Sequence, residues 1–469
     1  MSGGPSPVER LRQYLREISP QARALLLHEF ERGALSGEQL PGLDLILDEL
    51  RKEQRTSNYT SERLGAPDRR FFLPVEPFLV DEEIPERTAG RIARASLPRI
   101  WTWLERDLLP METQILLRDT RAALTVGDTV RADRLIHDFQ TQSLAAIEKA
   151  LAAIADNNKG RQKLVSQLGG ERVLEALLEI AAIFRVRGTL KELSSRLPEQ
   201  IKNLADAELD SARTLFEHPA LKRPDVFAYA LVVLFSRLAA PIHLLRLAVA
   251  SVETDSAKKI AETPFAFAID LIVDEMTRAS VRLALDMRAN SIPEICVGIK
   301  RFHDLARELA TEINMSDDAR WAKRIAQMRA DTAALLRSRI DGLPGQVRRL
   351  LRPQPKAEIG LGSVIDTHAV ADIEAALEVL RACRMYAAEV AVNEITLRVT
   401  SELETCLDTA TQALLDSVRH ASPEDRPFRL SQLDAAVRFS SKMFGRRYAE
   451  LLAKAAEVAT QSERRAAQG

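Results

Sequence analysis

The sequence predicts an all-α protein made of irregular multi-helix bundles with no significant β-sheet, and it leaves open whether the bundles are elongated. Apolar residues recur at three- and four-residue spacing in almost every stretch, and no run alternates with the two-residue period of a strand. Helix-start signals stand where these stretches begin, as in residues 6–9 (SPVE), which combine a cap, a proline and an acid. Only 19 Gly and 21 Pro occur in 469 residues, which excludes a collagen-like or low-complexity chain.

The chain begins with a predicted N-terminal helical unit over residues 1–55. Its helices are expected at 7–17, 20–32 and 43–54, with glycines in the turns between them. Residues 56–87 then form a linker followed by an apolar segment, because the first part of this range has no apolar stripe.

The apolar segment, residues 71–80, is called the strap. It holds seven large apolar side chains without a helical period, and Pro74 and Pro77 exclude a regular helix. Such a segment either lies in a groove of a partner or packs on the protein's own helices. Both interpretations are open from the sequence.

Residues 88–352 are predicted to form a central helical bundle with short breaks at glycines and prolines. Its most hydrophobic part is the predicted helix 225–250, where Val226 to Phe235 are apolar on every face, as in a buried core helix. A membrane span would need about 20 apolar residues. The flanking Arg237 and Arg246 leave contact with a membrane surface as the alternative.

The C-terminal part consists of a second linker, residues 353–367, and a predicted long-helix hairpin over 368–469. One helix is expected over 368–418 and another, folding back on it, over 429–460. The apolar positions keep neither a strict heptad nor a fixed repeat, so a bundle is favoured over a coiled coil or a solenoid.

Composition narrows the class of protein and its compartment. The 66 basic and 67 acidic residues give a net charge of −1, which argues against a chain devoted to nucleic acid or anionic membrane. Three cysteines without a CxxC pair and a start without a secretory pattern predict a cytoplasmic protein. Only 14 of the basic residues are Lys, and this preference for Arg indicates a GC-rich bacterial genome.

The motifs of common enzymes and metal sites are missing from the sequence. No Gly-Lys pair exists for a phosphate loop, and no GxSxG motif occurs. None of the seven histidines has an acid three residues before it or a second histidine within five residues. We therefore expect no cofactor and no metal. Helical enzymes without local motifs exist, so enzymatic activity is disfavoured without being excluded.

The preferred partner-binding region combines the strap with a tryptophan pair further along the chain. Exposed aromatic side chains are typical of protein contact surfaces. Three arginines, Arg87, Arg91 and Arg94, lie between the strap and the tryptophans. The candidate contacts are Phe71, Phe72, Phe78, Trp101 and Trp103.

A second candidate site is a basic stripe near the C-terminus, which would bind an anion. Arg438, Lys442 and Arg446 recur at four-residue spacing, which predicts one shared helix face, and Arg447 stands beside them. In the alternative interpretation, this face is solvated and paired with acids of a neighbouring helix such as Glu389, Glu402 or Glu404. The smaller cluster of Arg348, Arg349 and Arg352 has the same two interpretations.

A third candidate is a polar row on the predicted helix 294–313, made of Cys296, Lys300, His303 and Arg307. The row borders the apolar stripe of this helix, so we expect half-buried groups with shifted pKa values. It could serve an anionic small molecule, or it could be a polar seam between helices.

Together these observations predict a non-enzymatic, cytoplasmic protein–protein interaction or scaffold protein that binds a protein partner or a second copy of itself. One alternative is a binder of an anionic polymer or membrane surface through the basic stripe, although nucleic acid and membrane are disfavoured. The other is a small-molecule enzyme or sensor near His303.

Overall fold

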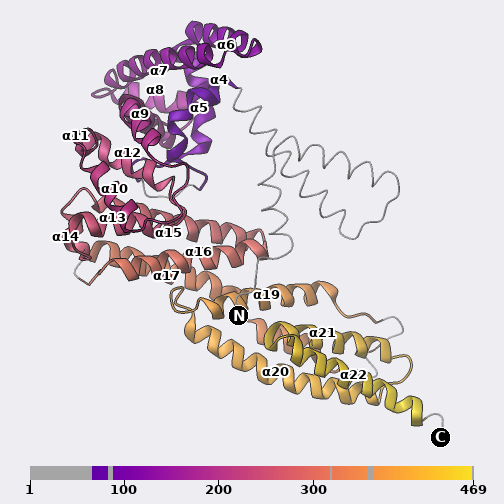
Figure 1. The fold of residues 1–469 in the computed structure, drawn as a ribbon. Helices are drawn as coiled ribbons and strands as arrows, with labels where there is room; N and C mark the ends of the chain where they lie inside the picture. Colours follow the sequence, from indigo (N-terminus) through magenta and orange to yellow (C-terminus); the bar gives the residue numbers. More distant parts are fainter. Residues whose placement is uncertain (1–65, 83–87, 317–318, 356–358, 360–362, 467–469) are drawn as a thin grey trace. The chain divides into compact units, whose positions relative to one another are not determined.

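A computed structural model describes residues 66–82, 88–316, 319–355, 359 and 363–466 (Figure 1). Over these residues the chain forms 19 α-helices and one two-stranded sheet, which confirms the predicted all-α fold class. The predicted N-terminal helices between residues 7 and 54 lie outside the described residues. The same holds for most of the predicted linker before the strap.

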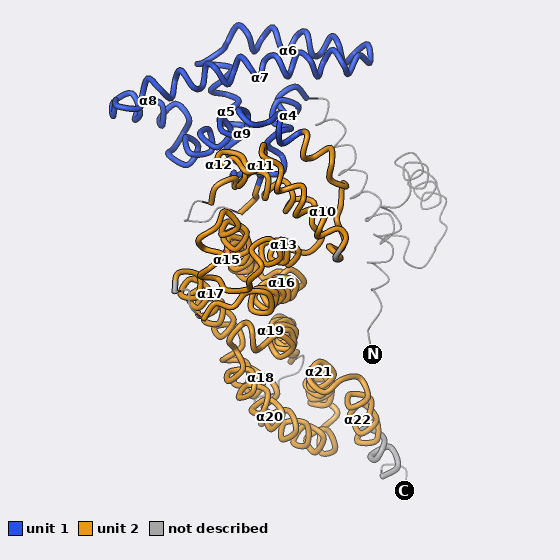
Figure 2. The backbone as a smooth tube through the Cα atoms, turned by 60° about the vertical axis from the view of Figure 1, so that its left-hand side comes forward, with its two compact units in different colours: residues 1–79, 92–191 blue, residues 80–91, 192–469 orange. Residues whose placement is uncertain are grey.

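The chain divides into two compact units (Figure 2). Unit 1 comprises residues 1–79 and 92–191, and unit 2 comprises residues 80–91 and 192–469. Residues 80–91 thus belong to unit 2 although they interrupt unit 1 in the sequence. The domain boundaries suggested by the sequence stay predictions.

Local sequence features explain where several helices of unit 1 begin and end. Pro98 and Pro110 stand in the first turns of α5 and α6, and the side chains of Asp128 and Asn157 cap α7 and α8. Gly169, with φ at 85°, ends α8. The elements are α4 (Pro67–Phe71), α5 (Leu97–Trp103), α6 (Pro110–Thr125), α7 (Thr129–Ala152), α8 (Asn158–Leu168) and α9 (Glu171–Arg196), the last of which runs into unit 2.

The strap has more regular structure than the sequence predicted. Its first residue ends α4, and Leu73–Phe78 form a 3₁₀ helix that contains Pro77. Leu79–Val80 then form β1, which pairs with β2 (Ile92–Ala93). Prolines are compatible with this short 3₁₀ helix because it needs few backbone donors.

Unit 2 is a series of helices that pack mainly on helices near them in the sequence. In this series α15 packs on α16, both α16 and α17 pack on α19, and α21 packs on α20 and α22 (Figures 1 and 2). The helices are α10 (Asp206–Phe216), α11 (Pro219–Lys222), α12 (Pro224–Phe235), α13 (Ile242–Val252), α14 (Ala257–Ala261), α15 (Ala266–Arg288), α16 (Ile292–Glu312), α17 (Ala319–Ile340), α18 (Leu343–Leu351), α19 (Thr367–Met385), α20 (Asn393–Arg419), α21 (Arg426–Phe444) and α22 (Arg446–Ala466).

Three predicted long helices are interrupted in the structure. The apolar helix 225–250 is split into α12 and α13, although its first half is buried as predicted. The helix predicted over 368–418 breaks between α19 and α20, where Ala391 has φ at 55°. The helix predicted over 429–460 breaks at Gly445, with φ at 87°. A positive φ is incompatible with a continuing α-helix, so both breaks change the helix direction.

A buried ionic network joins Thr88 and Arg91 to α15 within unit 2. Nη2 of Arg91 donates to Oε1 of Glu275 at 2.7 Å, and Nε of Arg278 donates to Oδ2 of Asp274 at 2.8 Å. The hydroxyl of Thr88 also donates to Asp274, at 2.8 Å. Burial lowers the pKa of Arg91, and the nearby carboxylates of Glu275 and Asp274 oppose that shift. The network therefore compensates the desolvation of charges that would otherwise be costly.

Candidate functional site

The candidate contacts of the strap lie in the core of unit 1. Phe71, Phe72 and Phe78 are buried, as is Trp103, whereas Trp101 is partly exposed. The ring of Phe71 lies 4.9 Å from that of Phe72 and 5.5 Å from that of Trp101, measured between centroids. This burial agrees with the alternative interpretation, in which the strap packs on the protein's own helices.

The arginines between the strap and the tryptophans have structural partners. Arg91 belongs to the buried network of unit 2, and Nη1 of Arg94 lies 3.2 Å from Oε1 of Glu76. Arg87 lies outside the described residues. The region therefore presents no row of accessible arginines in the described part of the chain.

The basic stripe is divided between two helices, which corrects the prediction of one shared face. Arg438 and Lys442 lie on α21, whereas Arg446 and Arg447 begin α22 after the break at Gly445. Nε of Arg438 lies 2.7 Å from Oε1 of Glu374, and this contact raises the pKa of Arg438.

The remaining cations of the stripe differ in their pairing. Lys442 donates to Glu378, and Arg446 pairs with Glu450 on its own helix at 3.0 Å. Arg447 is exposed. Glu374 and Glu378 of α19 thus neutralise Arg438 and Lys442. The sequence suggested other acids for this role.

The polar row on α16 separates into groups with different surroundings. Cys296 is half-buried, and burial followed by the charge of Glu378 raises the pKa of its thiol. Lys300 pairs with Asp304 one turn further on. A thiol with a raised pKa is a poor nucleophile at neutral pH. The first half of the row therefore has no activated group.

His303 and Arg307 lie near a groove that the sequence did not reveal. His303 is buried, with its Nδ1 2.9 Å from Oε2 of Glu389 and its ring 4.7 Å from that of Tyr386. Arg307, one turn further along α16, is exposed and lines the groove together with Glu389. The structure thus brings together part of the predicted row and a residue from the connection between α19 and α20.

The groove has a volume of about 520 Å³ and runs between α16 and α17. Its walls are mostly small or flexible apolar side chains, and its polar groups are few. The described lining residues are Ala306, Arg307, Leu309, Ala310, Thr311, Met315, Ala322, Ile325, Ala326, Arg329, Ala388 and Glu389.

Arg329 lines the groove and holds the α19–α20 connection through its guanidinium group. Its Nε donates to the carbonyl oxygen of Glu389 at 2.9 Å, and its Nη2 donates to that of Ala388 at 2.7 Å. The carbonyl oxygen of Ala388 also accepts from the backbone N–H of Ala391, at 3.4 Å. Arg329 is therefore engaged with the backbone.

Two of the polar groups that line the groove are already engaged by other residues of the chain. Arg329 is held by backbone carbonyls, and the carboxylate of Glu389 lies against His303. Within the described part of the chain, no three His, Cys, Asp or Glu side chains are placed to hold a metal ion. The groove is lined mainly by apolar side chains, and Arg307 and Thr311 are its exposed polar residues.

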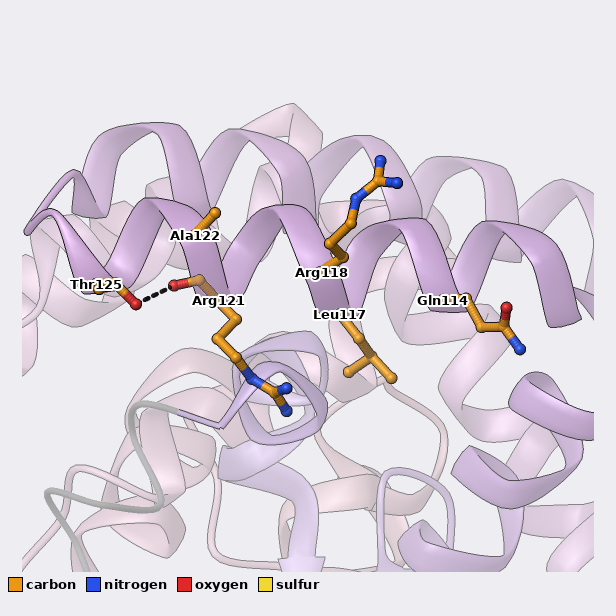
Figure 3. A pocket seen from close by; sticks show the side chains of 6 residues that line it. All are labelled: Gln114, Leu117, Arg118, Arg121, Ala122 and Thr125. Atoms are coloured by element: carbon orange, nitrogen blue, oxygen red, sulfur yellow. Dashed lines mark hydrogen bonds between the residues drawn. The ribbon is translucent and has the colours of Figure 1, made fainter.

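A second hollow, of about 530 Å³, lies along α6 in unit 1 (Figure 3). Its described lining residues all come from this one helix, and Arg118 and Arg121 point in different directions. Thr125 donates to the carbonyl oxygen of Arg121 at 2.8 Å, a bond within the helix. Because these side chains do not converge, the hollow is a weaker candidate than the α16–α17 groove.

Comparison with known proteins gives no relative for this chain: no family model, no curated protein and no solved structure matches it. Among the described helices, none is both long and apolar enough to cross a membrane.

Sequence reasoning reached the edge of the groove but missed most of its residues. His303 and Arg307 were found because they border the apolar stripe of α16. Ala322, Ala326 and Arg329 carry no motif, since alanine is common on solvated helix faces. The position of Glu389 depends on the break after α19, for which the sequence around Ala391 has no signal.

Proposed function

We propose that this protein is a non-enzymatic interaction or scaffold protein that binds an amphipathic helix of a partner protein in the α16–α17 groove. The observation that supports this proposal is the apolar lining of the groove on both walls. Amphipathic helices commonly bind by laying their apolar face into such a groove.

The dimensions and residue types of the groove suit a short helical segment. Ala306 and Ala310 lie one turn apart on α16, as do Ala322 and Ala326 on α17. Small side chains on both walls let a backbone approach closely, and Met315 can adapt its shape to an apolar anchor. From Ala322 to Arg329 the wall is about 10 Å long, at 1.5 Å per residue, which is about two helical turns.

The cation at the edge of the groove suggests which charge the partner helix carries beside its apolar residues. Arg307 is exposed there, whereas the nearby Arg329 is engaged with carbonyl oxygens. An acidic residue beside the apolar anchors of the partner would pair with Arg307. Such a pair at the edge of an interface contributes more to orientation than to affinity.

Site-specific photo-crosslinking, carried out in cells of the organism that naturally makes the protein, tests the proposal. A photoreactive phenylalanine analogue replaces Ala326 in the groove or, as a control, the exposed Ala334 on the same helix outside the groove. We expect a cross-link only from position 326, to an amphipathic helical segment of one partner. The further change Ala310→Trp should abolish it by filling the groove. Equal cross-linking from both positions, or none from either, would contradict the proposal.

The other functions expected from the sequence stay weaker proposals. Binding of an anionic polymer or membrane through Arg438, Lys442, Arg446 and Arg447 would compete with the acids of α19 that already pair with this surface. Steep weakening of binding with added salt would favour it. A small-molecule sensor near His303 would be favoured by saturable binding of an anionic metabolite that the change Arg307→Met removes. Residence in a bacterial cytoplasm is likewise a proposal.

A further inference from the structure

Helix α6 carries an exposed face that is mainly apolar. The helix packs on α4 and α7, and Leu116 is one of its buried residues. On another side of the same helix, Met111 is 69% exposed and Ile115 is 48% exposed. These two and the exposed Arg118 and Ala122 follow each other at intervals of four, three and four residues, so they share one side of the helix. We call these four residues the α6 face.

The hollow along α6 adjoins the α6 face (Figure 3). Arg118 and Ala122 belong to the face and also line the hollow, with Leu117 and Arg121 beside them. Arg118 donates to its neighbour Asp119 at 2.8 Å, whereas Arg121 is exposed and makes no ion pair with the residues that the structure describes. The surface therefore combines apolar side chains with a positive charge that has no partner in the described part of the chain.

One segment of this chain matches the α6 face in its apolar pattern. Residues 43–54, which lie outside the described residues, are predicted from their sequence to form a helix. Their apolar residues recur with the spacing i, i+3, i+4 and i+7, which places them on one side of a helix. These residues are Leu43, Ile46, Leu47 and Leu50. An amphipathic helix of this kind binds by laying its apolar side on a complementary surface.

The charge of this segment is opposite to that of the hollow. Residues 43–54 contain four acidic and two basic residues, which gives a net charge of −2. The two other helices predicted before residue 55 differ in this respect. Three basic and two acidic residues give 7–17 a net charge of +1, and two of each give 20–32 a net charge of zero. Of these three segments, 43–54 alone combines an apolar side with a net negative charge that can pair with Arg121.

The place where the segment joins the described chain favours docking within the same molecule. Helix α4 begins at Pro67 and packs on α6. The tether between the segment and α4, residues 55–66, spans up to about 40 Å when extended, whereas α6 is about 24 Å long. A short tether gives an effective concentration of about millimolar. The segment of the same chain therefore competes well against a second copy.

We propose that residues 43–54 form a helix that lies on the α6 face of the same molecule. Its apolar side packs against Met111 and Ile115, and its acids lie beside Arg121. This contact belongs to unit 1, whereas the groove between α16 and α17 belongs to unit 2, so the proposal does not depend on the proposed function.

Limited trypsin digestion of the full chain tests the proposal, with the cut sites mapped by mass spectrometry. Trypsin cleaves after Arg51 and Lys52, and a docked helix protects these bonds. Ile115→Asp places a carboxylate on the α6 face and should raise the rate of cleavage there at least about tenfold. Leu178→Asp is the matched control, because Leu178 is 40% exposed in unit 1 but lies on α9. Circular dichroism checks that each variant is folded. Equal cleavage rates in the unchanged chain and in the Ile115→Asp variant would overturn the proposal.

A pair of cysteines distinguishes docking within one molecule from docking on a second copy. Leu47→Cys combined with Ile115→Cys should form a disulfide within one chain on mild oxidation at low protein concentration, and peptide mapping identifies it. Leu47→Cys combined with Leu178→Cys should react at least about tenfold more slowly, because the tether alone does not hold that pair together. A disulfide that joins two chains would overturn docking within the molecule and show that a second copy supplies the helix. Similar rates for the two pairs, or no disulfide at position 115, would overturn the proposed contact.

Discussion

Arg91 and Glu275 form an ion pair, 2.7 Å between Nη2 and Oε1, in which both side chains are almost completely buried. Arg91 lies 184 residues before its partner in the sequence and is the last residue of the segment 80–91, which belongs to unit 2 although unit 1 continues after it. Charged pairs at the surface contribute little to stability, whereas a buried charge that loses its partner is costly. The network around this pair therefore ties Glu82, Thr88 and Arg91 to α15.

Asp274→Ala is expected to destabilise unit 2 strongly. The carboxylate of Asp274 is fully buried and contacts Arg91, Arg278 and Thr88. Its removal leaves two buried guanidinium groups undercompensated, which costs about 3–5 kcal/mol of unfolding free energy. Urea denaturation measures the change. The control Glu148→Ala removes the exposed pair with Arg185 and should cost less than about 1 kcal/mol. Equal effects of the two changes would contradict the importance of the network.

Phe71→Ala is expected to destabilise unit 1 by about 3–5 kcal/mol, because the fully buried ring packs against other aromatic rings. Leu73→Ala is the control: this side chain belongs to the same strap but is 55% exposed, so the change should have little effect. Thermal and urea unfolding give both values. A Phe71→Ala variant with unchanged stability would show that the strap is not part of the core. That result would favour the other interpretation, in which the strap binds a partner.

Arg329→Met is expected to loosen the connection between α19 and α20. The change removes donors to the carbonyl oxygens of Ala388 and Glu389 and costs about 1–3 kcal/mol. Hydrogen exchange of the amides between residues 386 and 392 should accelerate. Arg337→Met, at an exposed position of the same helix, should leave exchange unchanged. Unchanged exchange in both variants would mean that Arg329 does not hold the connection.

Cys383 is expected to resist alkylation in the folded protein. Burial raises the pKa of its thiol to about 12 from 9.0, so the reactive thiolate is scarce at neutral pH. The folded state retains this proton more tightly than the unfolded state, and stability should therefore fall as the pH rises from 9.0 toward 12. Labelling with N-ethylmaleimide, followed by peptide mapping in native buffer and in urea, checks the reactivity. Rapid labelling of Cys383 in native buffer would contradict its burial.

Local signals in the sequence predicted much of the helical structure. The apolar run from Val226 to Phe235 forms the buried α12, as its pattern predicted. The breaks were harder to predict. Gly445 marks one of them with an ordinary turn residue, but Ala391 adopts a positive φ without any residue type that favours it. Packing around the connection, including the bonds from Arg329, holds that conformation.

In the candidate sites, too, the sequence identified some residues, whereas others are brought there only by the tertiary structure. The sequence placed Arg307 and His303 beside the core stripe of α16, and it identified the cations of the basic stripe. It could not show that Glu374 and Glu378 neutralise the first two cations, because these acids lie 64 residues earlier in the chain. Nor could it show the groove, whose walls come from α16, α17 and the α19–α20 connection.

The sequence by itself determined the all-α class, because helical periodicity, caps and prolines act through bonds between residues three or four positions apart. Only the tertiary structure decided which apolar surfaces are covered. Phe71 and the exposed Leu451 are both large and apolar in the sequence, yet one lies in the core of unit 1 and the other on an open helix face. That difference depends on which distant segments pack against each side chain, and hydrophobic burial has no preferred direction or sequence separation.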